Sequence, residues 1–291
     1  MKKSRAFSLI ELSIVILIIG ILVAGVTQGS RVVAQMKLST ARSLTRGSDV
    51  NGISDICLWL DATAEGMLSN ASGSTNVGDG DTVSAWADQN PQTIARYSFA
   101  QGTDAMRPIY EANGINGLPT LYFDATNNAD GKALLPSSSF VFLTSEVTVF
   151  IVMRPIEAPV EEGYIIDSYA ETDDKRFLIG ISSDAKTHLY ASGSDVLDLA
   201  AVALNNNYIT SAVATSTTSS IYRNGVLQES GAGLHSAFTA DNFSIGSVYV
   251  GESGNFDGYI SEFIMFSRAL KTAERQSVEK YLGKKYGVKI S

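Results

Sequence analysis

The sequence has few of the residues on which metal, redox and triad chemistry depend. Its 291 residues include one cysteine, Cys57, and two histidines, His188 and His235. A single cysteine excludes an internal disulfide and any site built on a Cys-x-x-Cys pair. Two separate histidines offer little for a histidine-ligated metal or a Ser-His-Asp triad. The sequence also lacks GxSxG, HExxH and P-loop motifs, so several large classes of enzyme are excluded.

Basic residues are scarce outside the N-terminal part of the chain. The 22 Lys and Arg against 30 Asp and Glu give a net charge of -8. Residues 1–46 hold seven basic groups and one acidic group, or +6, which leaves 15 basic and 29 acidic groups, or -14, for the remainder. Binding to phosphates requires a basic face. We therefore expect no nucleic-acid partner for the larger part.

A long apolar run opens the chain. The twenty residues from Phe7 to Val26 contain only two serines and one acid, Glu11, among apolar residues. About twenty such residues in a helix span the roughly 30 Å core of a bilayer. Three cations among the first five residues place the N-terminus on the cytoplasmic side, so the rest of the chain is expected to be exported.

The apolar run has three interpretations, and Glu11 separates them. A cleaved signal peptide and a simple membrane anchor both fit a basic start followed by apolar residues. A carboxylate in lipid costs about 2.5–3.5 kcal/mol at a helix centre and less near its end, and such residues are mostly functional. Glu11 therefore favours the third interpretation, in which the segment takes part in assembly.

The N-terminal sequence KKSRAFSLIELSIVILIIGILVAG resembles type IV prepilins and type II secretion pseudopilins. The resemblance implies cleavage between Ala6 and Phe7 by a prepilin peptidase, and N-methylation of Phe7. Ala6 stands where the family more often has glycine. It also implies that Glu11, the fifth mature residue, pairs with the amino terminus of a neighbouring pilin subunit and sets the axial stagger. The protein would reside in the bacterial inner membrane and then in an extracellular pilus.

Helical character is expected to continue beyond the membrane. Residues 31–46 contain no glycine or proline, and Val33, Met36, Thr40 and Leu44 recur on one helical face. This pattern predicts one helix over 7–46, about 60 Å long. Residues 47–55 break the pattern with Gly, Asp and Asn, and we expect them to form a linker.

The rest of the chain alternates short β-rich runs with polar turns, which predicts an all-β sandwich or barrel. The Asn224-Gly225 pair predicts a hairpin. The apolar run 147–153 predicts a central strand covered on both faces, and Trp59 and Trp86 are expected in the core. A closing helix is expected over 272–286, capped by Thr272. The predicted strands are 56–61, 119–124, 147–153, 164–167, 177–181, 208–214, 220–222, 226–228, 243–245 and 259–266.

Several motifs in this part carry a second resemblance. They are LWLDA at 58–62, VSAWADQN at 83–90, the run 107–124, SIYRNGVL, and the final segment from FDGYISEF onward. In this order they are similar to the laminin-G-like branch of the concanavalin A-like lectin/glucanase jelly rolls. The resemblance implies a jelly-roll domain over 56–291 that binds glycans or proteins, often with Ca²⁺.

Catalytic carboxylates are not evident. Retaining glucanases of this fold hold two carboxylates about 5–5.5 Å apart on one strand face. The sequence has no E-x-D-x-E run, and the adjacent Glu161 and Glu162 would point to opposite faces of a strand. We therefore expect no catalytic residue and no enzyme.

Candidate binding residues lie in polar loops. Oxygen ligands for Ca²⁺ are offered by two loops, and solvated turns are the alternative. Aromatic side chains that could stack on sugars are also present, and core burial is equally open for each. The metal candidates are Asp79, Asp81, Asp124, Asn128 and Asp130, and the sugar candidates are Tyr97, Tyr169 and Tyr190.

Together these features predict a minor or tip type IV pilin that displays a lectin-like domain for adhesion to glycans or glycoproteins. Its expected partners are other pilin subunits, the prepilin peptidase and the inner membrane. Two alternatives remain open: a type II secretion pseudopilin with a structural role, and a membrane-tethered polysaccharide hydrolase.

Overall fold

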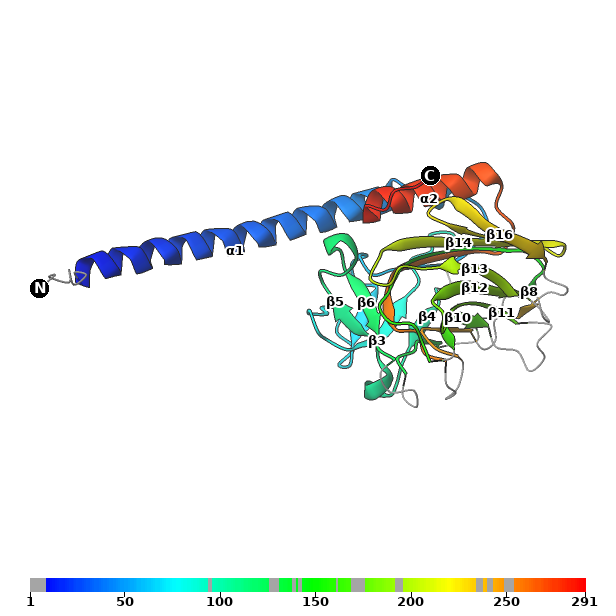
Figure 1. The fold of residues 1–291 in the computed structure, drawn as a ribbon, viewed down its shortest axis with the longest axis horizontal. Coiled ribbons are helices and arrows are strands. Elements are labelled where there is room, and N and C mark those ends of the chain that lie inside the picture. Colours follow the sequence, from blue (N-terminus) through cyan, green and yellow to red (C-terminus); the bar gives the residue numbers. More distant parts are fainter. Residues whose placement is uncertain are drawn as a thin grey trace, which may run out of the picture.

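A long helix leads into a β-sandwich in the computed structural model (Figure 1). The helix projects from the sandwich for most of its length, and the C-terminus lies close to its inner end. The structure describes residues 9–93, 96–125, 131–137, 140, 143–160, 162–168, 176–191, 196–233, 238–239, 243–248 and 254–291.

The helix α1 runs without interruption over Leu9–Arg46. Its 38 residues correspond to about 57 Å at 1.5 Å per residue. The side chains of the outer turns are exposed, whereas Ala41 and Thr45 near the inner end are buried. The helix predicted over 7–46 is therefore present over all its described residues.

The first sheet has eight antiparallel strands with β9 and β19 at its centre. Its order is β16-β15-β14-β9-β19-β6-β5, and β1 pairs with β19 beyond the end of β6. The strands are β1 Ile56–Asp61, β5 Ile109–Glu111, β6 Thr120–Phe123, β9 Val147–Pro155, β14 Tyr208–Ala214, β15 Thr218–Arg223, β16 Val226–Ala232 and β19 Gly258–Phe266.

The second layer is built from two smaller sheets whose edge strands are joined by hydrogen bonds. Leu134 and Ile245 exchange two backbone hydrogen bonds of 3.0 Å, which connect the order β13-β12-β11-β10-β18 to β7-β4-β3-β2. The strands are β2 Leu68–Asn70, β3 Val83–Ala87, β4 Ser98–Ala100, β7 Leu135–Pro136, β10 Glu162–Ser168, β11 Phe177–Ser182, β12 Lys186–Ala191, β13 Val196–Ala201 and β18 Phe243–Ile245. A separate pair joins β8 Leu143–Thr144 to β17 Phe238–Thr239.

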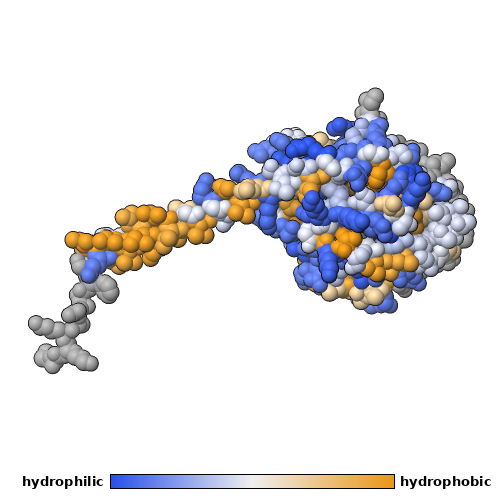
Figure 2. Space-filling model, turned by 90° about the horizontal axis from the view of Figure 1, so that it is seen from above, coloured by the Kyte–Doolittle hydropathy of each residue, from blue (hydrophilic) through white to orange (hydrophobic). Residues whose placement is uncertain are grey.

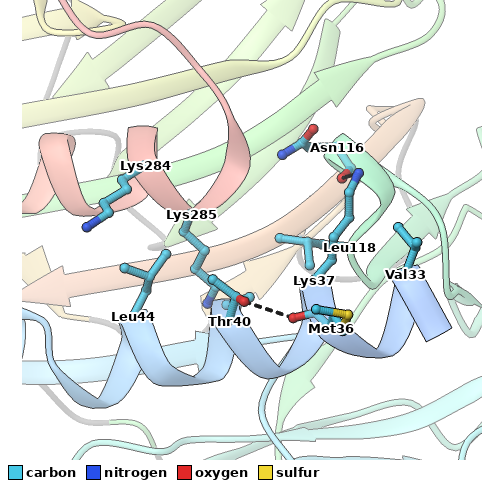
Figure 3. Close-up of a pocket in the computed structure, with 10 residues that line it drawn as sticks. Val33, Met36, Lys37, Thr40, Leu44, Asn116, Leu118, Lys284 and Lys285 are labelled. Carbon is cyan, nitrogen blue, oxygen red and sulfur yellow. Dashed lines mark hydrogen bonds between the residues drawn. The ribbon is translucent and has the colours of Figure 1, made fainter.

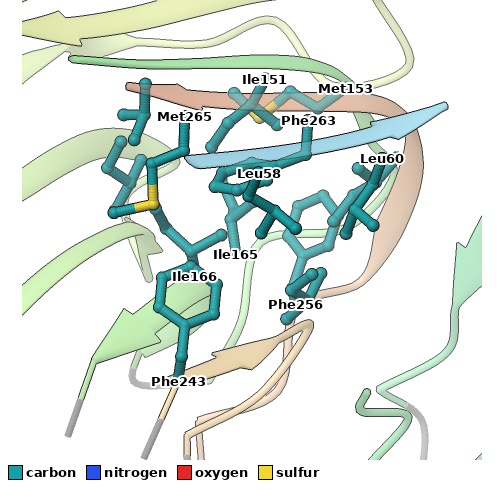
Figure 4. Packing of buried hydrophobic residues seen from close by; sticks show 14 of the residues in the cluster. Leu58, Leu60, Ile151, Met153, Ile165, Ile166, Phe243, Phe256, Phe263 and Met265 are labelled. Carbon is teal, nitrogen blue, oxygen red and sulfur yellow. The ribbon is translucent and has the colours of Figure 1, made fainter. Parts of the chain in front are cut away.

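The main core lies between the two layers, because alternate residues of each strand point to opposite faces. Leu58 of β1, Ile151 of β9 and Phe263 of β19 meet Ile166 and Phe243 of the second layer (Figure 4). Trp86 also belongs to this core and is fully buried. The sandwich predicted from the sequence is confirmed.

A second apolar cluster covers the opposite face of the first sheet. Phe150 of β9 and Ile264 of β19 pack there with Trp59 of β1 and with Val278 and Leu282 of the closing helix. The closing helix, α2, spans Thr272–Tyr286, as the sequence predicted. The run 147–153 is thus covered on both faces, by the second sheet on one side and by helices on the other.

Two local predictions require correction. Thr272 does not cap α2: the capping position is Lys271, whose backbone N–H donates to Glu274 Oε2 at 2.9 Å. The segment 47–55, predicted as a linker, is packed against the sandwich. It contains the 3₁₀ helix η1, Asp49–Gly52, and buries Val50 and Ile53 in the second cluster. Two further 3₁₀ turns are η2 Asp104–Met106 and η3 Ile115–Gly117.

The hairpin between β15 and β16 offers a test of how much steric crowding adds to the cost of a positive φ. Asn224 and Gly225 have φ of 51° and 84°, and a Cβ on Gly225 would lie 2.7 Å from Ile290 Cγ2. We expect Gly225→Ala to lower the free energy of unfolding by about 2 kcal/mol, because positive φ and overpacking both oppose it. Urea unfolding of the full chain in detergent measures this. Gly80→Ala is the matched control, since Gly80 has φ of 86° but open space around it. Equal losses in both variants would show that crowding at Ile290 is irrelevant.

Candidate functional site: the junction of the stem helix and the sandwich

The outer part of α1, called the stem here, is a nearly unbroken apolar surface. Its exposed side chains from Leu9 to Val26 are almost all Leu, Ile or Val, and Figure 2 shows them as a continuous band along the stem. The stem is long and apolar enough to cross a membrane. Glu11 lies on its exposed surface near the outer end. Ala6 and Phe7, the predicted processing residues, lie outside the described residues.

A buried ionic network joins the stem to the sandwich. The Lys285 ammonium of α2 donates to Asp61 Oδ2 of β1 at 2.6 Å, to Glu262 Oε2 of β19 at 2.7 Å and to Thr45 Oγ1 of α1 at 2.8 Å. The side chains of Lys285, Asp61 and Glu262 have no exposed surface. One cation therefore connects α1 and β1 from the N-terminal part of the sequence with β19 and α2 from its C-terminal part.

The remaining oxygens of the two carboxylates are also hydrogen bonded. Glu262 accepts from Trp59 Nε1 at 2.7 Å, from the Tyr281 hydroxyl at 2.7 Å and from the Tyr286 hydroxyl at 3.0 Å. Asp61 Oδ1 accepts from the backbone N–H and the hydroxyl of Thr63 at 2.8 and 2.7 Å. Hydrogen bonds to every carboxylate oxygen offset the cost of burying these charges in an interior of low dielectric constant.

The two acids of the network differ in their protonation. Burial opposes ionisation of Asp61, but Lys285 and Thr63 outweigh burial and lower the pKa of Asp61 below 3.8. Burial dominates at Glu262, and the nearby Asp61 charge adds to it, so the pKa of Glu262 rises above 4.5 despite Lys285. Burial and the neighbouring carboxylates also raise the pKa of Tyr281 and Tyr286, so both phenols stay neutral donors.

These directions make Glu262 the member of the network that takes up a proton first. Paired carboxylates with separated pKa values also occur in glycosidase sites. Here the pair is sealed from solvent, so no substrate can reach it. The geometry therefore indicates a structural junction.

An apolar groove of about 380 Å³ runs beside this junction, between α1 and the sandwich. Val33, Met36 and Leu44 of α1 line it with Leu118, and Figure 3 shows Asn116 and Lys284 at its rim. Val33, Met36 and Leu44 belong to the helical face identified in the sequence. That face is therefore turned toward the sandwich without being fully covered by it.

The candidate sugar-stacking residues lie apart from one another. Tyr97 is half-buried, with its ring 4.7 Å from that of Phe140 at 84°, so it packs against the core aromatics. Tyr190 is half-buried on β12, and β11, β10, β18 and β7 separate it from β4, which follows Tyr97. Tyr169 lies outside the described residues. The structure does not assemble Tyr97 and Tyr190 into one platform.

The carboxylates of Asp79 and Asp81, two of the metal candidates, accept hydrogen bonds from backbone N–H groups of the protein. Asp79 Oδ1 accepts from the Ala112 backbone N–H at 2.8 Å, and Asp81 Oδ2 accepts from that of Gly78 at 2.8 Å. Asp124 is half-buried, and Asn128 and Asp130 lie outside the described residues. Within the part of the chain that the structure describes, no three acidic, His or Cys side chains converge. Calcium binding stays a prediction.

The junction network was not predicted from the sequence. Three charged residues at positions where the pattern predicts apolar ones could have indicated it. Asp61 ends the apolar run LWLD, Glu262 interrupts the run YISEFIMF, and Lys285 lies between buried positions of α2. What the sequence could not show is that these three side chains meet.

The chain belongs to the concanavalin A-like lectin/glucanases superfamily, whose family model matches residues 126–274, just over half of the sequence. Residues 1–27 match the prokaryotic N-terminal methylation motif. β1 to β6 precede the matched region but belong to the same sandwich. The two findings fit a pilin-like protein with a lectin-like domain and suggest a structural or binding role. No curated protein matches the sequence.

Solved structures share the fold at low sequence identity. The botulinum neurotoxin serotype G binding domain is 13% identical, with a TM-score of 0.53 over 78% of this chain and 51% of the toxin chain. A botulinum neurotoxin type C structure, described as interacting with two ganglioside molecules, is 13% identical, with a TM-score of 0.54 over 80% and 52%. Trypanosoma rangeli sialidase is 12% identical, with a TM-score of 0.50 over 80% and 33%. The chain thus spans about half of the toxin chains and a third of the sialidase.

Proposed function

We propose that this protein is a minor or tip subunit of a type IV pilus that presents its lectin-like sandwich for adhesion to glycans or glycoproteins. The observation that carries the proposal is the Lys285 network, which fixes the sandwich to the stem. A filament that incorporates the stem then displays the sandwich in a set orientation. Processing by a prepilin peptidase and contact with other pilin subunits follow from the methylation motif.

The size of the sandwich supports a minor or tip role. Packed helices approach each other to about 8–10 Å. Figure 1 shows that the sandwich is far wider than a helix. It packs against the last turns of α1, where Ala41 and Thr45 are buried. A filament core in which every stem carried such a domain would be crowded near the junction. Occasional or terminal incorporation avoids that conflict.

The apolar groove gives the proposed assembly a further contact. Its Val33, Met36 and Leu44 continue the apolar surface of the stem toward the sandwich. We propose that a neighbouring subunit's stem covers both surfaces in the filament, because large exposed apolar surface is otherwise unfavourable in water.

The test combines localisation with binding. Antibodies against the sandwich are applied to intact cells, and the full-length protein in detergent micelles is applied to a glycan and matrix-protein array with and without Ca²⁺ chelation. We expect labelling along or at the tips of surface filaments and binding to at least one glycan or glycoprotein. Labelling only after the outer membrane is opened would indicate a secretion pseudopilin. Release of sugar from an arrayed glycan would indicate a hydrolase, and silence on the array would leave a scaffold role.

A further inference from the structure

A second groove lies where the stem meets the sandwich, and its lining is polar. Its volume is about 340 Å³. Arg42 of α1 lines this groove, whereas the preceding residue, Ala41, lines the apolar groove. Successive residues of an α-helix are about 100° apart around its axis, so the two grooves lie on different sides of α1. The other contributors are the loop after β1, the loop between β2 and β3, and Tyr110 of β5. Stem and sandwich therefore build this groove together.

Arg42 is held in place by two hydrogen bonds, and its guanidinium has further N–H groups that can donate to a ligand. Its Nε donates to the Thr63 carbonyl at 2.8 Å and its Nη1 to Glu65 Oε2 at 3.3 Å. A guanidinium has five N–H donors, and these two bonds use two of them. Arg42 is half-buried, which restricts its motion, whereas the Glu65 side chain is 86% exposed at the rim.

Tyr110 contributes an aromatic ring on a fixed backbone. Its carbonyl accepts from Gly80 N–H at 2.8 Å, and its N–H donates to the Asp81 carbonyl at 2.9 Å. The ring is half-buried and packs partly against the main core, but unlike Tyr97 it also lines this groove. Burial raises the pKa of its hydroxyl despite Arg42, so the phenol stays neutral as donor and acceptor. Asn76, exposed on the opposite loop, adds an amide with both donor and acceptor groups.

We propose that this groove binds the end of a neutral oligosaccharide, one or two sugar rings long. A half-buried aromatic ring with convergent donors and acceptors suits the apolar faces and hydroxyls of a sugar. Ligand pockets are about 300–1,000 Å³, so the groove is at the small end of that range. Arg42 is balanced by Glu65, and Asp79 lies near Tyr110, so the site carries no excess positive charge for an acidic sugar. The proposal rests on the adhesive function and assigns its ligand class and place.

The experiment uses the full-length protein in detergent micelles on an array of lactose, cellobiose, N,N′-diacetylchitobiose and sialyllactose. We expect binding to at least one of the three neutral disaccharides. Arg42→Ala and Asn76→Ala should each weaken that binding at least tenfold, and circular dichroism should show that both variants are folded at the assay temperature. Arg46→Ala and Asn206→Ala are the matched controls, since both residues are exposed and lie outside the groove lining.

The outcomes separate this proposal from the function on which it rests. Binding of a neutral sugar that survives both Arg42→Ala and Asn76→Ala overturns the groove and leaves adhesion intact. Binding of sialyllactose alone overturns the neutral ligand class. Absence of all binding here and on the wider glycan and matrix-protein array overturns the groove and the adhesive function together.

Discussion

Lys285→Met is expected to lower the free energy of unfolding by about 3–5 kcal/mol at neutral pH. The substitution keeps the length of the side chain but leaves Asp61 and Glu262 buried without their cation. Removing one partner of a buried ionic network costs far more than removing an exposed pair, because the remaining charge stays desolvated. Urea unfolding of the full-length protein in detergent measures the loss.

The loss should depend on pH in a defined direction. In the native protein the pKa of Asp61 is depressed, so its contribution to stability is present above 3.8 and disappears as the pH falls through the lower folded value. The pKa of Glu262 is raised, so its effect on stability becomes less favourable as the pH rises from 4.5 through its folded value. Without Lys285 both acids lose the group that lowers their pKa values. The difference in stability between the variant and the native protein should therefore be smallest below pH 3.8 and should grow as the pH rises to 7.

Lys284→Met is the matched control, because Lys284 is the preceding residue of α2 and is exposed. It should change the free energy of unfolding by no more than about 0.5 kcal/mol. If Lys285→Met and Lys284→Met unfold at the same urea concentration, the network does not hold the junction together.

Glu11→Ala is expected to reduce incorporation into surface filaments at least about tenfold, which corresponds to 1.4 kcal/mol of lost subunit contact. A carboxylate in an apolar segment is stabilised by a cationic partner, and in the proposed filament this partner is the amino terminus of a neighbouring subunit. The measurement is quantitative immunoblotting of sheared filaments against total cell protein.

Ser13→Ala serves as the control for the stem. Ser13 is exposed on the same part of α1, and its hydroxyl donates only locally, to the Ile10 carbonyl at 2.8 Å. Its substitution should leave filament content unchanged. Normal incorporation of Glu11→Ala would remove the role assigned to this carboxylate and leave a membrane-tethered sandwich.

Periodicity predicted much of the fold. β1, β14 and β18 begin and end where the apolar runs 56–61, 208–214 and 243–245 do, and α2 matches 272–286. In each case turn residues bound a run whose side chains are buried, so local pattern and tertiary packing agree. The Asn224-Gly225 hairpin was predictable for the same reason, since both residues adopt the positive φ that the turn requires.

The junction was not predictable, because it depends on long-range contacts. Asp61 and Lys285 are 224 residues apart, and no local pattern specifies that their side chains meet at 2.6 Å. The burial of Val50 and Ile53 likewise depends on the position that α2 takes on the first sheet. The same holds for the polar groove, whose Arg42 and Tyr110 lie on different elements.

The positions of the junction residues also set an order for maturation. Thr45 and Asp61 come from the N-terminal part of the sequence, whereas Lys285 follows Asp61 by 224 residues. The contact between the stem and the sandwich at Lys285 can therefore form only after α2 has been synthesised. A chain that stops before Lys285 would leave Asp61 and Glu262 buried without their cation, so its sandwich would not be fixed to the stem at this point.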